Sequence, residues 1–132
     1  MPRMPEFSSP DDLAPPHGYS HAVRIPAGEL VWISGQLAVR PDGSVPFRDW
    51  EGQARLAFEN AGRALRAGGA GWEDVVKLTI FVVDIAHLAT VRVVRDEFVD
   101  TARPPTSSLV QVAALVRPEL LIEIEAVAHL PG

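Results

Sequence analysis

Leu-Ile-Glu-Ile-Glu-Ala-Val-Ala, residues 121–128, carries the clearest structural signal in this 132-residue chain. Ile122 and Ile124 alternate with glutamates, which is the two-residue period of a β-strand. The glutamates, Glu123 and Glu125, share one face of that strand, and charged side chains are rarely buried without a partner. We therefore expect a strand with one face on the core and the other beside a partner or a wet cleft.

Further strand signals lie on either side of this stretch. The wider segment 120–130 is expected to form one strand, and 109–112 a shorter strand before it. Residues 75–83 form a run rich in β-branched and aromatic side chains, in which Lys77 and Thr79 are the only polar members. That length and composition are typical of a central strand buried on both faces.

The N-terminal third is expected to open the sheet. Residues 19–25 and 30–39 have strand-like composition, and the Pro-Ala-Gly-Glu sequence between them has the chemistry of a tight turn. A short β-meander is therefore predicted there. Residues 1–17 are rich in Pro, Ser and Asp and show no period, so we expect a flexible arm before a single domain at 18–132.

The first helical signal covers residues 50–65. Its apolar side chains fall on one stripe, and Glu51–Arg55 and Glu59–Arg63 are i,i+4 pairs in the favourable order on the opposite side. The Gly-Gly pair that follows supplies a C-terminal stop.

A second helix is predicted from a cap at Asp84 to Val99. The predicted order is thus ββαβαββ, an α+β domain with two helices on one face of a mixed sheet. Two helices cover one face only. The other face, with Trp32, Phe81 and Val83 or their neighbours, needs other cover, and self-association is the expected source.

Composition excludes several functions. Without cysteine the chain has no disulfide, thiol catalysis or Cys-ligated metal, and its four histidines lack the usual metal-binding spacings, so no metal is expected. A net charge of −5 with a single lysine disfavours a nucleic-acid surface. No apolar run has the length of a signal peptide or a membrane span, so a cytoplasmic protein without a membrane partner is expected.

Five blocks stand out along the chain, at residues 19–23, 31–36, 75–81, 109–115 and 122–128. They resemble the signature segments of the RidA/YjgF/RutC family, also called endoribonuclease L-PSP or reactive-intermediate deaminases. The similarity runs in unbroken order from about Gly18 to Leu130. It implies a chorismate-mutase-like fold and a homotrimer with ligand clefts between neighbouring subunits, which would cover the second sheet face.

The resemblance also implies a chemistry, the hydrolysis of enamines and imines such as 2-aminoacrylate to 2-keto acids and ammonia, without a metal or organic cofactor. Active members carry an arginine in a Pro-Ala-Arg-Ser pattern, and such a cation clamps the substrate carboxylate through two hydrogen bonds. Here the pattern reads Pro-Thr-Ser-Ser, with Ser107 in place of the arginine. Since serine cannot neutralise a carboxylate, we expect the archetypal deaminase activity to be impaired.

Site residues follow from the same resemblance. Glu123 matches the cleft glutamate and is the catalytic candidate; the alternative is a strand charge paired with an arginine, and whether Glu125 lies nearer the ligand stays open. Tyr19 matches a pocket-lining residue, or else packs at an interface. Ser34 and Gly35 match the pocket floor, although Gly35 would equally suit a bulge.

The remaining candidates are Arg92, Ser107 and Leu109. Arg92 stands where the family usually has an asparagine on the second helix, and it could return a cation to the cleft; the alternative is a solvated or inter-subunit ion pair.

The leading hypothesis is a trimer that acts in its inter-subunit clefts as a cofactor-independent hydrolase or binding protein. Its ligand would be a small metabolite whose anionic group is weakly recognised or absent. The alternative is a non-enzymatic ligand-binding or chaperone-like trimer. Endoribonuclease action is the third possibility, and the acidic balance disfavours it.

Overall fold

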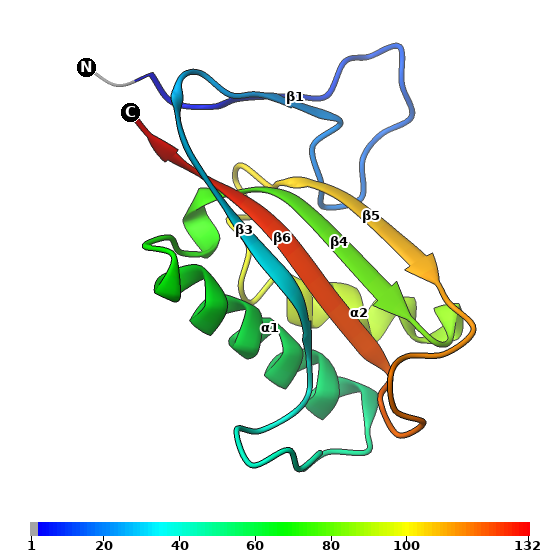
Figure 1. The fold of residues 1–132 in the computed structure, drawn as a ribbon. Helices are drawn as coiled ribbons and strands as arrows, with labels where there is room; N and C mark the ends of the chain where they lie inside the picture. The colour runs from blue at the N-terminus through cyan, green and yellow to red at the C-terminus, as the bar shows by residue number, and fades with distance from the viewer. Residues whose placement is uncertain (1–2) are drawn as a thin grey trace.

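A mixed four-stranded sheet with two helices on one face forms the body of the molecule in the computed structural model, which describes residues 3–132 (Figure 1). Within the sheet the order is β3-β6-β4-β5; β6 is antiparallel to both of its neighbours, and β4 and β5 are parallel. The elements are β1 Glu6–Ser8, β2 Ala22–Arg24, β3 Gly28–Leu37, α1 Trp50–Ala67, η1 Trp72–Asp74, β4 Val75–Val82, η2 Ile85–His87, α2 Leu88–Arg95, β5 Thr106–Gln111 and β6 Ile122–Pro131.

The strand β6 confirms the alternation expected at 121–128. Ile122 and Ile124 are buried in the core beneath the helices, whereas Glu123 and Glu125 are only partly buried and point to the opposite face. Because β6 lies inside the sheet, both of its backbone edges are hydrogen-bonded. The expected α+β class, with two helices packed on one face of a mixed sheet, is confirmed (Figure 1).

The helix α1 forms where the periodicity predicts it. Asp49 caps its start by accepting a hydrogen bond from the Gly52 amide at 2.8 Å, and Gly68 closes its end. The expected ion pairs are present on its outer side: Arg55–Glu51 has an N–O distance of 3.8 Å, and the pair two turns later has one of 3.7 Å.

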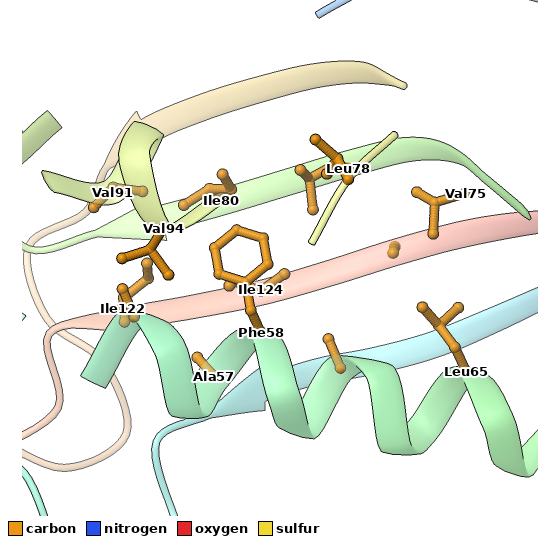
Figure 2. Packing of buried hydrophobic residues seen from close by; sticks show 14 of the residues in the cluster. Ala57, Phe58, Leu65, Val75, Leu78, Ile80, Val91, Val94, Ile122 and Ile124 are labelled. Carbon is orange, nitrogen blue, oxygen red and sulfur yellow. The ribbon is translucent and has the colours of Figure 1, made fainter. Parts of the chain in front are cut away.

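The core lies between α1, α2 and the helix-side face of the sheet. In Figure 2 the ring of Phe58 points from α1 toward Ile80 and Ile124 of the two central strands. Phe58 is fully buried and also packs against Trp72 and Phe98, with ring centroids 5.3 Å apart in each pair. Aromatic packing of this kind adds to the stabilisation from buried apolar area.

The predicted meander at the N-terminus is wrong. The strand β2 pairs with β1 in a separate two-stranded sheet, and β3 has β6 as its only partner within residues 3–132. Arg103 holds β1 in place instead, since its Nη2 donates to the Pro5 carbonyl at 2.9 Å and its guanidinium lies over the Phe7 ring. The arm expected at 1–17 therefore contains a strand.

The second helix is shorter than predicted. Asp84 accepts a hydrogen bond from the Ala86 amide at 2.9 Å, as a cap should, but it opens the single 3₁₀ turn η2 before α2. Beyond α2 the chain continues in tight i→i+3 turns, which bring Phe98 onto the core. Val91 and Val94 of α2 are buried in the core, although the α-helical part ends at Arg95.

The sheet face away from the helices has little cover within one chain. Trp32 on β3 is 72% exposed, and its register partner Val127 on β6 is half-buried. Lys77 and Thr79 of β4 lie on the same face, so the strand expected to be buried on both sides is buried on one.

Candidate functional site

A pocket of about 270 Å³ lies between β5, α2 and the segment before β2. It brings together four of the predicted site residues, Tyr19, Arg92, Ser107 and Leu109. The other lining residues are His17, Ile80, Ile85, Leu88 and Arg95. Among these residues there are two arginines and no carboxylate, so the pocket favours an anion.

The strand register explains why Ser107 and Leu109 face this pocket. In the parallel pair of β5 with β4, Ser107 lies beside Leu78 and Leu109 beside Ile80. Those β4 residues belong to the buried core, so their neighbours point to the helix side as well. Ser108, one position away, points to the other face and accepts a hydrogen bond from Lys77 Nζ at 3.1 Å.

Tyr19 reaches the pocket because the chain around it is attached to the loop before β5. The Ser20 amide donates to the Pro105 carbonyl at 3.1 Å, and the Ser20 hydroxyl donates to the Pro104 carbonyl at 2.6 Å. Ser20 is buried by these contacts. The Tyr19 ring also meets His21 edge-on at 5.3 Å, which fixes its position at the pocket wall.

The two arginines come from one face of α2, three residues apart. Arg92 is partly buried and forms no ion pair within residues 3–132. Arg95 is only 7% exposed, and its Nε donates to Asp96 Oδ1 at 2.9 Å. Its guanidinium lies against Gly18 on the facing segment.

Glu123, Ser34 and Gly35 do not join this pocket within one chain. Gly35 and Glu123 meet instead on the far side, where a Cβ at Gly35 would collide with the Glu123 carboxylate. A shift of register between Ile33 and Gln36 places Ser34 and Gly35 in a bulge of β3, as the alternative for Gly35 expected. The predicted site residues thus form two groups, one on each face of the sheet.

Two polar pocket residues, His17 and Arg95, were missed by sequence reasoning, as were the apolar Ile80, Ile85 and Leu88. Arg95 carried a usable signal, because it lies one turn after Arg92 and beside the buried Val94 on a helix predicted to cover the sheet. The position of His17 depends on how the segment before β2 docks, and no local pattern indicates that docking.

Within residues 3–132, no three histidine, aspartate or glutamate side chains gather as a metal site would require. Neither helix of this part of the chain has both the length and the apolar character needed to cross a membrane.

Comparisons with known proteins agree with this α+β architecture. The model of the Endoribonuclease L-PSP family matches residues 9–130. RutC family protein slr0709 of Synechocystis is 36% identical over 125 residues, covering 89% of this chain and 90% of the relative. The 2-iminobutanoate/2-iminopropanoate deaminase of Salmonella typhimurium is 38% identical, with coverage of 76% and 80%.

A solved structure from the same group of proteins has the same fold. YyfB from Yersinia pestis, a protein of unknown function in the conserved Rid protein family, superposes with a TM-score of 0.89 at 36% identity, covering 97% of this chain and 100% of that one. The chain belongs to the Endoribonuclease L-PSP family, the group of RidA, YjgF and RutC proteins that its sequence blocks resemble.

Proposed function

We propose that the protein is a RidA-like homotrimer that binds or hydrolyses a small imine or enamine in clefts between its subunits. The observation that carries this proposal is the pocket in which Tyr19, Arg92, Ser107 and Leu109 converge. Its volume of about 270 Å³ suits a metabolite. A cytoplasmic location is part of the proposal.

The split of the candidate residues supports a shared cleft. Glu123 and Gly35 lie on the uncovered face of the sheet, while Ser107 lies on the helix side. A neighbouring copy that covers the exposed face could bring its pocket beside this Glu123, and each cleft would then draw on two chains. The exposed Trp32 gives that face an apolar contact to bury.

In the proposed reaction, water adds to the carbon of a C=N bond and the nitrogen takes up a proton. The C–N bond of the resulting carbinolamine then breaks, and the products are a 2-keto acid and ammonia. Glu123 would orient the water and accept its proton, and the Ser107 hydroxyl would donate a hydrogen bond to the substrate. The name of the Salmonella relative, an iminobutanoate and iminopropanoate deaminase, supports this substrate class.

The test is ammonia release from freshly generated 2-iminopropanoate and 2-aminoacrylate, compared between this protein, its Glu123→Gln variant and an arginine-bearing relative. We expect Glu123→Gln to lower the rate by about 10²-fold or more, as loss of a general base does. We expect the native protein to be slower than the relative. Equal rates would overturn the role given to Ser107, and a Glu123→Gln rate equal to the native one would overturn that of Glu123.

A non-enzymatic ligand-binding trimer is the second candidate, because the pocket persists although the arginine of the family pattern is replaced by Ser107. A metabolite that raises the melting temperature without being converted would favour it. Ribonuclease action would show as salt-sensitive RNA binding, which the net charge of −5 disfavours.

A further inference from the structure

The pocket has a cationic wall and an apolar floor. Arg92 and Arg95 lie on successive turns of α2 and form the wall. Ile80, Leu88 and Leu109 supply the apolar side chains of the floor. A molecule with one anionic end and a short apolar body would satisfy both parts at once.

The Arg95 guanidinium has hydrogen-bond donors that the described part of the chain does not use. Asp96 occupies its Nε, and within residues 3–132 neither Nη group forms a hydrogen bond to the protein. At 7% exposure most of the Arg95 side chain is buried, so an acceptor inside the pocket is the natural partner for the Nη donors that this part of the chain leaves free. The planar fork of an arginine presents such donors in the geometry of a carboxylate.

The Arg95 guanidinium packs against Gly18, which has no side chain. The residue has φ of +82°, a conformation that side chains other than glycine rarely adopt. A Cβ built there would overlap Arg95 Nη2 and lie 2.9 Å from Arg95 Cζ. A side chain at position 18 would therefore force the Arg95 guanidinium to move.

We infer that Arg95, with Arg92 beside it, is the anion clamp of this pocket, and that the ligand is a short carboxylate held by its acid group from α2. The inference deepens the proposed function and rests on it, since it concerns the same pocket. It assigns the charge recognition to a helix, whereas the Ser107 strand offers only a hydroxyl.

The test is a calorimetric binding titration with two stable probes, 2-oxobutanoate and its neutral amide, at low ionic strength. The variants are Arg95→Gln, Arg92→Gln and Gly18→Ala, and the matched control is Arg66→Gln, which removes the same charge from the exposed end of α1. Circular dichroism and a thermal melt establish that each variant folds.

We expect the native protein and Arg66→Gln to bind the acid more tightly than the amide. Arg95→Gln should weaken acid binding by about 10-fold or more, as loss of a desolvated charge partner does, and leave amide binding unchanged. Gly18→Ala should act in the same direction by displacing the guanidinium. If Arg95→Gln does not fold, Arg92→Gln at its more exposed position provides the same test.

Four results would overturn the inference: no binding of the acid by the native protein, equal affinity for acid and amide, unchanged acid affinity in the arginine variants, or tighter binding of inorganic phosphate than of 2-oxobutanoate. These outcomes are separate from the fate of the proposed function. If the protein releases ammonia but both arginine variants bind the acid normally, the arginine clamp alone is rejected. If acid binding depends on the arginines but no ammonia is released, the proposed hydrolytic activity alone is rejected.

Discussion

Gly35 shows how one residue can control a candidate catalytic group. It lies in the bulge of β3, and the Glu123 carboxylate fills the space that a side chain at position 35 would need. The contact is with the flexible end of Glu123, so a small side chain could be admitted if the carboxylate moved. The glycine thus bears on where Glu123 points more than on whether the sheet forms.

Gly35→Ala should therefore displace Glu123 while changing stability little, by less than about 1 kcal/mol, since a side-chain rotation relieves the clash. A crystal structure of the variant, together with its unfolding curve, checks this. Gly43→Ala is a useful comparison, because position 43 has φ of +86° and nothing nearby, so backbone strain is its only cost. A Glu123 carboxylate that keeps its native position in the Gly35→Ala variant would contradict the expectation.

At the scale of elements, α1 is the part that sequence reasoning describes best. Its apolar stripe, ion pairs and glycine stop are all local signals, and the structure shows each of them; the Asp49 cap is a local feature that was not predicted. The β-meander predicted at the N-terminus was wrong because the pairing of β2 depends on contacts between residues far apart in the sequence. The choice of β2 between the edge of β3 and the distant β1 depends on contacts such as Arg103 with Pro5, which no window around β2 contains.

The residues of the candidate site also fall into two groups, those that the sequence indicated and those that depend on distant contacts. The family resemblance pointed to Tyr19, Arg92, Ser107 and Leu109, which do meet in one pocket. Arg95 escaped because a charged residue on a short helix is most often solvated. Its burial depends on Gly18, which lies far earlier in the chain.

Phe58→Ala should cost about 3–5 kcal/mol of unfolding free energy, because it empties the volume between α1 and the central strands. Chemical denaturation measures the loss. Phe47→Ala, at a side chain that is 39% exposed before α1, is the control and should cost much less. Similar losses at both positions would mean that the aromatic cluster around Phe58 is not the centre of the core.

A surface ion pair joins α1 to the turn after α2. Arg55 donates to both Glu97 oxygens, at 3.0 and 2.6 Å, and these bonds hold the pKa of Glu97 below its ordinary value of 4.5. Because the pKa of Glu97 is lower in the folded than in the unfolded protein, the ion pair stabilises the fold at any pH above the unfolded-state pKa. This stabilisation is lost as the pH falls through the folded-state pKa.

Glu97→Gln should therefore lower the melting temperature slightly at neutral pH, and the difference from the native protein should fade as the pH drops below 4.5. Thermal melts across an acid pH series measure it. The effect should also shrink in high salt, because both side chains are exposed. A difference that grows toward acid pH would contradict this assignment.

For the whole molecule, the uncovered sheet face is the surface that most needs a partner. Helices shield one side of the sheet, and the other presents Trp32 with Lys77, Thr79 and Val127 around it. Trp32 lies on the edge strand β3 and forms with Val127 an exposed apolar patch, a feature that often marks an interaction surface. The homotrimer of the proposed function would bury it.

Light scattering after size-exclusion chromatography should give about three times the 14.3-kDa chain mass for the native protein. Trp32→Asp should shift the mass toward that of one chain, since it places a charge in the proposed contact. Val93→Asp, on the exposed side of α2, should leave the mass unchanged. A native mass of 14.3 kDa, or an unaltered assembly of Trp32→Asp, would reject this face as the interface.

The hydrogen bond from Ser20 to the Pro104 carbonyl spans 84 positions. During synthesis on the ribosome, the segment that carries Tyr19 and Ser20 has no docking partner until most of the polypeptide has been made. Closing a loop of that length has a large entropic cost, so this segment should be among the last parts to settle and among the first to open in the mature protein. A ligand that fills the pocket would then slow amide exchange at residues 18–21 more than anywhere in α1.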